Sequence, residues 1–189
     1  MNQVRIIGGA WRSRRIMFPD APGLRPTPDR VRETLFNWLQ ADVPFSRCLD
    51  LFAGSGALGF EAASRGAREV VLVDSHPAVA SQLRASAALL GADQVAVAAV
   101  KAEAFLARPP QVFDLVFLDP PFAQGWPPRI CALLECGAWL APGAKIYLEA
   151  ERGWTLSGLP DHWRLLKRQA AGEVAYYLFQ RQAEAAAGS

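Results

Sequence analysis

The chain has 189 residues, of which 51% are hydrophobic and 20% charged, which is enough for one substantial core. Its three cysteines and two histidines match neither a disulfide framework nor a zinc-ligand pattern, so we expect no structural metal. It has no apolar run long enough to span a membrane and no signal-peptide core after Met1. These features predict a cytoplasmic protein without a membrane partner. We expect the protein to be a monomer, although none of these features determines its oligomeric state.

Charge is unevenly distributed along the chain. Residues 1–32 hold seven arginines against two aspartates, a net charge of +5, which leaves −3 on the other residues. A basic arm on a mildly acidic body predicts a polyanionic partner that meets the N-terminal end. The alternative is an arginine-rich face that is merely solvated.

The first predicted elements are a β-hairpin and a helix. Residues 4–7 and 15–18 have the composition of two short strands joined by a glycine-containing turn. Residues 19–26 form a loop rich in proline and glycine. Thr27 is then predicted to cap a helix whose first position is Pro28.

From residue 48 onward, strand-like and helical segments alternate. Short apolar runs predict strands at 48–52, 70–73, 95–97, 113–118 and 146–148. The intervening segments predict helices at 57–65, 77–90, 102–108 and 128–136. Such alternation is typical of an α/β fold with a mostly parallel, doubly wound sheet that helices cover on both faces.

The chain closes with two strand-like runs, 163–169 and 174–180, which leave no room for a helix between them. They predict an antiparallel hairpin at the edge of the sheet. We therefore divide the chain into an N-terminal hairpin extension (1–26), a main domain (27–182) and a flexible tail (183–189).

A glycine-rich motif follows the strand at 48–52. Gly54, Gly56 and Gly59 form G-x-G-x-x-G directly after a strand and at the start of a helix, where bare backbone admits a ligand. Asp50 precedes the motif and suits a ligand with a cationic end, such as the sulfonium and amino groups of S-adenosylmethionine. Asp74 ends the next strand, where a ribose-binding acid is expected. The runner-up reading is a nicotinamide- or flavin-binding protein, whose pyrophosphate Asp50 would oppose.

The adenine end of this ligand is expected beyond the third strand, around residues 101–105. A backbone amide there can bond the ring, and Phe105 either flanks the ring or belongs to the helix core. The predicted cofactor site comprises Asp50, Phe52, Ala53, Gly54, Ser55, Gly56, Gly59, Asp74, Ser75, Lys101, Ala102 and Glu103.

A second motif, Asp119-Pro120-Pro121-Phe122, ends the strand at 113–118. Two prolines hold the backbone rigid after a buried strand and leave a carbonyl outside the ladder. The Asp119 carboxylate and the Pro120 carbonyl can accept both hydrogens of a base amino group, and Phe122 can stack on the base. These four residues are therefore predicted to be the catalytic set of an amino methyltransferase, in which positioning and local electrostatics drive the transfer.

With these motifs the sequence resembles the bacterial 16S ribosomal RNA guanine methyltransferases of the D type. The resemblance covers nearly the whole chain. Its family-specific part is the N-terminal block, and the two motifs above are shared with many amino methyltransferases. It rests on residues 5–9, 11–12, 23–27, 29–39, 50–59, 119–122 and 172–176.

The resemblance implies a seven-stranded, Rossmann-like class I S-adenosylmethionine methyltransferase with an N-terminal β-hairpin extension. Its substrate would be the 2-amino group of one guanine in 16S rRNA, within the 30S subunit or its assembly intermediate. Lys101 stands where the family has a small polar residue beside adenine, so Glu103 or a backbone carbonyl is expected to hold the adenine amino group.

Three functions remain open on the sequence. The first is rRNA guanine methylation, with RNA contacts expected from Arg5, Trp11, Arg12, Arg14, Arg15, Arg25 and Arg30. Trp11 either stacks on an unpaired base or packs under the hairpin. The second is methylation of an amino group of DNA adenine or cytosine or of protein glutamine, and the third is a nicotinamide-dependent oxidoreductase.

Overall fold

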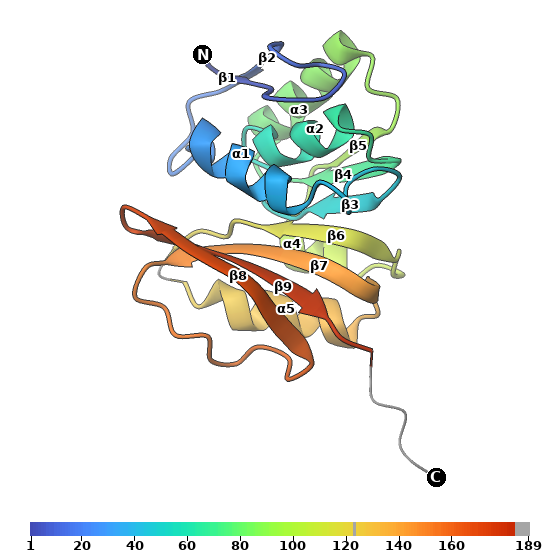
Figure 1. Ribbon diagram of the computed structural model, residues 1–189. Coiled ribbons are helices and arrows are strands. Elements are labelled where there is room, and N and C mark those ends of the chain that lie inside the picture. The colour runs from blue at the N-terminus through green and yellow to red at the C-terminus, as the bar shows by residue number, and fades with distance from the viewer. Residues whose placement is uncertain (123, 184–189) are drawn as a thin grey trace.

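The computed structural model describes residues 1–122 and 124–183, and within them seven strands form one mixed sheet (Figure 1). The order across the sheet is β5-β4-β3-β6-β7-β9-β8. Its strands are β3 (Arg47–Asp50), β4 (Glu69–Val73), β5 (Val95–Ala98), β6 (Phe113–Leu118), β7 (Leu140–Glu151), β8 (Trp163–Ala171) and β9 (Val174–Arg181). The first five are parallel, and β9 pairs antiparallel with both β7 and β8.

Helices cover both faces of the sheet, as the alternating pattern predicts. One face packs against α1 (Asp29–Trp38), α2 (Ala57–Ser64) and α3 (Pro77–Leu90), and the other against α4 (Ala102–Leu106) and α5 (Trp126–Cys136). The two apolar clusters centre on Phe117 and Val116, neighbours on β6 whose side chains point to opposite faces. This is the predicted fold class, with the antiparallel C-terminal hairpin at the edge that was expected.

The N-terminal hairpin is a separate two-stranded sheet of β1 (Asn2–Arg5) and β2 (Arg15–Phe18) that lies beside α2 and α3 (Figure 1). Ile6 and Ile16 are buried in the cluster beneath the helices. Gly9 has a positive φ of 79°, and a Cβ there would lie 2.0 Å from the Ser64 carbonyl oxygen. The hairpin is therefore fixed against α2 by backbone contact that only glycine permits.

Three local predictions need correction. Helix α1 begins at Asp29 with Pro28 as its N-cap, so Thr27 does not cap it. The Thr27 side chain is buried and donates a hydrogen bond to Glu149 instead. Strand β3 ends at Asp50 and α4 at Leu106, each two residues earlier than predicted.

The remaining predicted elements coincide with observed ones or differ by a few residues, except β7, which extends well beyond 146–148. The predicted tail at 183–189 lies, apart from residue 183, outside the described residues. In the described ranges, no helix has the length and apolar character needed to cross a bilayer.

Candidate active site

The carboxyl ends of the parallel strands bring the predicted site residues together. Asp50 pairs in register with Phe117, and Leu118 pairs with Leu148. Asp119 therefore leaves β6 one residue beyond its pairing with β7, on the same edge where β3 delivers Asp50. Open α/β sheets bind their ligands at this edge, near the point where the strand order reverses.

The glycine motif forms a tight turn between β3 and α2. Gly54 and Gly56 both have positive φ, 52° and 79°, and Gly56 is the left-handed N-cap of α2. A Cβ on Gly56 would lie 2.6 Å from the Phe60 ring, and one on Gly59 would lie 2.2 Å from Leu72. Only at Gly54 would a Cβ meet nothing closer than 3.7 Å, so Gly54 is the position that leaves backbone open to a ligand.

Asp74 lies against this turn from the end of β4. Its carboxylate accepts hydrogen bonds from the Gly54 backbone N–H at 3.0 Å and from the His76 backbone N–H at 2.9 Å. A carboxylate has further lone pairs, so these bonds leave acceptor capacity for ribose hydroxyls. The arrangement fits a nucleoside held between the ends of β3 and β4.

Asp50 is the buried acid of the cofactor region. Burial is the largest cause that raises the pKa of its carboxyl, and the nearby charges of Asp74 and Glu149 act in the same direction. Backbone hydrogen bonds from Phe52 and Gly59 oppose them, and the resulting pKa is about 7. An acid in this condition favours a cationic ligand group, because a cation compensates for the lost solvation of the carboxylate. This chemistry fits the sulfonium and amino groups of S-adenosylmethionine.

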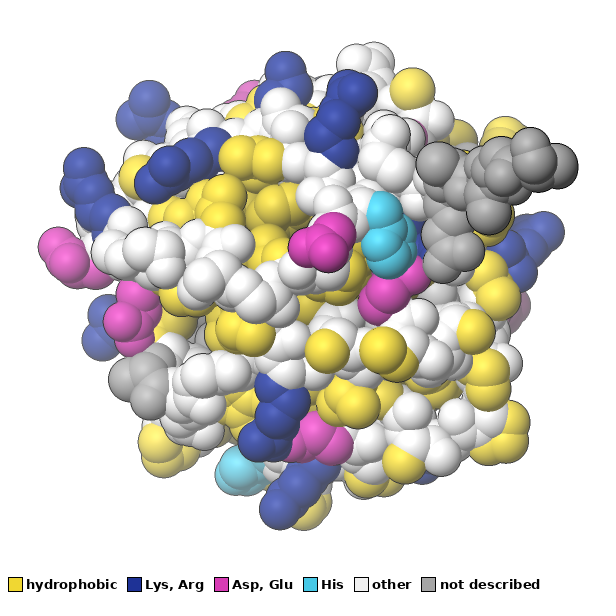
Figure 2. Space-filling model, turned by 90° about the horizontal axis from the view of Figure 1, so that it is seen from below, with side chains coloured by type: hydrophobic (Ala, Val, Ile, Leu, Met, Phe, Trp, Pro, Cys, Tyr) yellow, Lys and Arg dark blue, Asp and Glu magenta, His cyan; other side chains and the backbone are white. Residues whose placement is uncertain are grey.

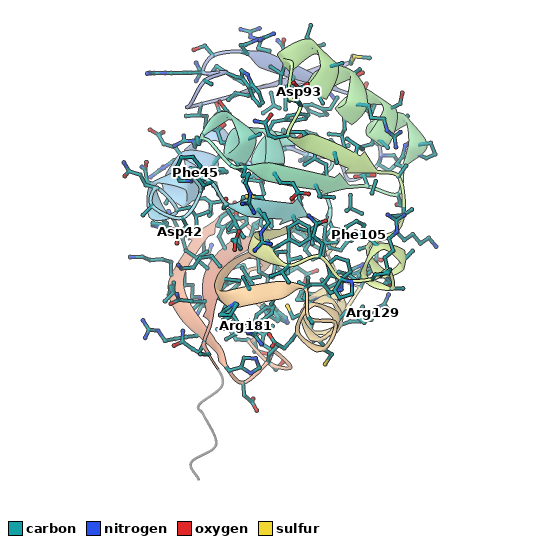
Figure 3. All side chains as sticks on the ribbon, turned by 90° about the vertical axis from the view of Figure 1, so that its right-hand side faces the viewer. Asp42, Phe45, Asp93, Phe105, Arg129 and Arg181 are labelled. Carbon is teal, nitrogen blue, oxygen red and sulfur yellow. The ribbon has the colours of Figure 1, made fainter. Side chains whose placement is uncertain are left out.

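The structure selects one of the two alternatives for Phe105. Phe105 is 6% exposed and packs against Trp139 at 5.2 Å between ring centroids, so it belongs to the core and does not flank a ligand. Figure 3 shows Phe105 and Arg129 on the same side of the molecule. The Glu103 carboxylate forms an ion pair with Arg129, and the Lys101 backbone caps α4. The ring beside the cofactor loop is Trp126, which meets Phe52 edge-to-face at 5.6 Å.

The four residues of the second motif differ in exposure. Pro120 is buried, Asp119 is half-buried, and Pro121 and Phe122 are exposed, with Phe122 at 41%. The loop therefore presents an exposed aromatic ring two residues after a proline whose side chain is buried. The carboxyl, the carbonyl and the ring of this motif therefore differ in their access to solvent.

Asp119 has a partner that the sequence reading did not identify. Its carboxyl is hydrogen-bonded to Glu149, a buried residue of β7. Burial and the charges of Glu149 and Asp50 raise the pKa of Asp119 well above its usual range. Glu149 also accepts hydrogen bonds from Thr27 at 2.7 Å and from Tyr147 at 2.9 Å.

The N-terminal arginines fall into three groups. Arg32 is buried and bonds to the carbonyls of Thr27 and Arg5 and to Glu61, so it belongs to the core. Arg5 pairs with Asp29 at 3.5 Å, and Arg14 donates to the Leu89 carbonyl at 3.0 Å. Among residues 1–32, all of which the structure describes, the exposed arginines whose side chains form no ion pair or hydrogen bond within the protein are Arg12, Arg15, Arg25 and Arg30.

The arm also contains two hollows. The larger, of about 750 Å³, is lined by hairpin residues including Met17 and by Leu24 and Arg25. The smaller, of about 350 Å³, runs past Arg15 to Thr27. Trp11 is partly buried against the core below the hairpin, which supports the packing alternative for this residue.

Glu149, Thr27 and Trp126 are the site residues that the sequence reading missed. Glu149 carried a weak signal, since it is a charged residue inside an apolar run at 146–150. The position of Thr27 before Pro28 predicts a helix cap. Its actual partner, Glu149, lies 122 residues away in the sequence. A local pattern does not reveal such a partner.

Comparisons with known proteins agree with this geometry. The profile of the family described as conserved hypothetical protein 95 matches residues 4–180. The chain is 48% identical over 182 residues to the ribosomal RNA small subunit methyltransferase D of Escherichia coli K12, covering 96% of this chain and 92% of that protein. These matches span both the hairpin and the sheet domain.

Solved structures share the fold. A candidate methyltransferase from Escherichia coli superposes with a TM-score of 0.89 at 47% identity, covering 97% of this chain and 100% of that one. An RNA methyltransferase from Salinibacter ruber, in complex with S-adenosyl-L-homocysteine, has a TM-score of 0.60 at 19% identity, over 87% and 98% of the two chains. The sheet is that of class I S-adenosylmethionine methyltransferases, which removes the nicotinamide-dependent alternative. The chain belongs to the conserved hypothetical protein 95 family, in the branch of the small-subunit rRNA methyltransferases D.

Proposed function

We propose that this protein transfers a methyl group from S-adenosylmethionine to the exocyclic 2-amino group of a guanine in 16S rRNA. The substrate would be the 30S subunit or its assembly intermediate. The observation that carries the proposal is the Asp119–Phe122 loop at the same sheet edge as the Asp50 glycine turn. The relatives' name and the basic hairpin support RNA as the acceptor over DNA or protein.

The cofactor supplies an electrophilic methyl group on a sulfonium. Asp50 compensates the cationic end, Gly54 offers open backbone, and Asp74 accepts from the ribose hydroxyls. Phe52, Ala53, Ser55, Ser75, Lys101, Ala102 and Glu103 complete the proposed cofactor shell. Trp126 extends it beside Phe52.

The acceptor nitrogen is a poor nucleophile because its lone pair is delocalised into the base. Asp119 and the Pro120 carbonyl would accept its two hydrogens and turn the lone pair toward the methyl group. Phe122 would stack on the base once it has left its own stack. In the transfer, the nitrogen–carbon bond would form as the carbon–sulfur bond breaks, with the demethylated cofactor as leaving group. The methylated nitrogen would then release one proton to solvent water.

Residues 1–26 are proposed as the RNA-binding extension. The hollow between Arg15 and Thr27 leads from the hairpin toward the residue that touches Glu149. Phosphate contacts along such a path would fix the register of the RNA, while the loop at Asp119 would select the base.

The test is methyl transfer into small subunits that lack the modification, followed by mapping of the methylated nucleotide. Naked 16S rRNA, duplex DNA and a glutamine-containing protein serve as competing acceptors. Methylation of a single guanine at N2 in the subunit supports the proposal. Preferred transfer to DNA or protein, or to another atom of the RNA base, overturns it.

A further inference from the structure

The acids at the sheet edge are connected to the N-terminal segment by a continuous line of buried hydrogen bonds. Arg32 Nε donates to the Thr27 carbonyl at 3.0 Å, and Arg32 Nη1 donates to the Arg5 carbonyl at 2.9 Å. The Thr27 hydroxyl donates to Glu149 at 2.7 Å, and Glu149 is hydrogen-bonded to Asp119. Each link is buried or part-buried, so water competes for it only weakly.

Two carboxyls in contact require a proton between them, because adjacent buried carboxylates repel each other. Glu149 already accepts hydrogen bonds from two hydroxyls, Thr27 and Tyr147, which stabilise its charged form. In the described ranges no hydroxyl donates to the Asp119 carboxyl, and burial and the charge of Glu149 raise its pKa. These differences favour Asp119 over Glu149 as the carboxyl that keeps the proton.

We propose that Glu149 and Thr27 are positioning residues: Thr27 fixes Glu149, and Glu149 holds the protonated side of Asp119 so that its other oxygen faces the acceptor amino group. This inference rests on the proposed role of Asp119 in amino methylation. Asp119 then presents one carbonyl-type acceptor and one donor, as an asparagine would. Because Thr27 is tied to Arg5 through Arg32, the hairpin helps to set the geometry of the acid.

The position of the pair predicts a specific pH dependence. Besides Glu149, the groups that face Asp119 are Asp50 on β3, Tyr147 on β7 and Tyr176 on β9, and all of them become more negative as pH rises. Loss of the shared proton leaves two carboxylates that repel, so Asp119 moves off its position. Turnover therefore falls at alkaline pH. The pKa of this alkaline limb in the profile of kcat against pH describes the two coupled carboxyls together and not either residue alone.

The first experiment separates turnover from binding in three variants. Thr27→Val removes the hydroxyl at nearly constant shape and is expected to lower kcat about tenfold with little change in the cofactor Kd. Thr27→Ser, which keeps the hydroxyl, recovers most of that loss. Thr34→Val is the matched control, since Thr34 lies on α1 and bonds only locally to the Arg30 carbonyl, and its kcat stays that of the wild type.

The second experiment records kcat against pH for the wild type, Asp119→Asn and Glu149→Gln. Asp119→Asn keeps the acceptor without a titrating proton, so it is at least tenfold more active than Asp119→Ala and lacks the alkaline limb. Glu149→Gln also loses that limb and is about ten- to a hundredfold slower. Wild-type kcat in both Thr27→Val and Glu149→Gln, or an unchanged alkaline limb in Asp119→Asn, overturns the inference.

A third measurement needs no substrate. The infrared carbonyl band of a protonated carboxyl is recorded at pH 8, where Asp50, with a pKa of about 7, is mostly charged. A band that is present in the wild type and absent in Asp119→Asn supports the shared proton, and its absence from the wild type overturns it. If the wild type fails to methylate ribosomal subunits while this band is present, the proposed substrate is wrong and the acid pair stands.

Discussion

At the scale of single residues, four acids at one sheet edge have different environments and therefore different proposed tasks. Asp74 is half-buried and bonded to backbone N–H groups, whereas Asp50 is buried with a pKa raised to about 7. Asp119 and Glu149 are hydrogen-bonded to each other, and burial raises the pKa of both carboxyls. Differences of this kind assign roles to carboxyls more reliably than their residue type does.

Asp119→Ala is expected to abolish most methyl transfer while leaving cofactor affinity unchanged, because Asp119 faces the acceptor and not the cofactor. Loss of one preorganised acceptor raises the barrier by about 2.7–4 kcal/mol, by analogy with removal of one oxyanion-hole donor. Single-turnover transfer of labelled methyl and calorimetry with S-adenosylmethionine measure the two quantities. Near-normal turnover would contradict the assignment.

Asp74→Ala is expected to have the opposite effect. It removes the acceptor of the ribose hydroxyls, so S-adenosylmethionine and its demethylated product should both bind more weakly, by about 1.5–3 kcal/mol. Because Asp74 also accepts from Gly54 and His76, the melting temperature of the variant is needed as a control for the turn. Unchanged affinity for both ligands would place the ribose elsewhere.

Asp50 predicts a pH dependence of cofactor binding. Its pKa of about 7 in the free protein means that a proton occupies it below pH 7, and a cationic ligand lowers that pKa. Binding should therefore release a proton below pH 7, and affinity should rise as pH increases from 5 to about 7. Calorimetry in buffers of different ionisation enthalpy detects the proton, and Asp50→Asn should remove the dependence.

The stability of the cofactor-free protein depends on pH in the opposite direction. A raised carboxyl pKa in the folded state contributes stability that is fully present below the unfolded value of 3.8 and is lost as pH rises through about 7. In the absence of cofactor, Asp50 therefore opposes stability at neutral pH. Cofactor binding compensates for this effect.

At the scale of elements, α2 connects the hairpin to the sheet. Glu61 is fully buried in a helix that is otherwise small and apolar, and it accepts from the backbone N–H groups of Ile7 and Gly8. It also pairs with Arg32 and Arg65. The Glu61 carboxylate therefore accepts hydrogen bonds from the hairpin backbone and forms ion pairs with two arginines at the same time.

Glu61→Gln is expected to destabilise the fold by roughly 3–5 kcal/mol, because it leaves Arg32 buried with only part of its compensation. The measurement is urea unfolding of the whole chain, followed by tryptophan fluorescence. Glu33→Gln, an exposed change of the same kind on α1, serves as the control and should be neutral. Equal stability of the two variants would contradict a structural role for Glu61.

The edge strand β8 shows how the sheet ends. Its exposed positions include Arg164, Lys167 and Arg168, and Arg168 lies over the Tyr177 ring at 5.6 Å. Figure 2 shows basic side chains bordering an apolar area on the side of the molecule seen from below. Charged side chains on an edge strand disfavour pairing with a second chain.

At the scale of the whole molecule, basic groups lie at two ends. The hairpin carries one set, and β8, at the opposite end of the strand order from β5, carries the other (Figure 1). Only the first set adjoins the hollow that leads to Thr27. The proposed RNA path therefore predicts unequal effects of removing the same charge from each end.

Replacing Arg12, Arg15 and Arg25 with alanine is expected to weaken binding to small subunits and leave cofactor affinity intact. The log–log dependence of affinity on salt should become shallower by roughly 0.7–0.9 per lost phosphate contact. The control replaces Arg164, Lys167 and Arg168, which removes three charges of the same sign from β8. Equal losses in the two variants would show a general charge effect and contradict a specific path along the hairpin.

Most of the fold could be predicted from sequence because its signals are local. Apolar runs, helix-closing glycines and the Gly172 turn each act within a few residues, and they located every strand of the main sheet. The glycine motif and the prolines after Leu118 mark strand ends, and parallel strands place those ends at one edge. The positions of Asp50, Asp74 and Asp119 followed from this rule alone.

Tertiary structure decided which side chains meet. Thr27 has the sequence features of a helix cap, but a buried carboxyl 122 residues away offers its hydroxyl a better partner than exposed backbone does. From sequence alone, Arg32 is indistinguishable from the exposed arginines around it. In the structure it is buried and bonded to Glu61 and to two backbone carbonyls. Long-range pairing between buried polar groups depends on the packed sheet. Packing removes water from these groups, and each of them then needs a hydrogen-bond partner within the protein to offset the cost of desolvation.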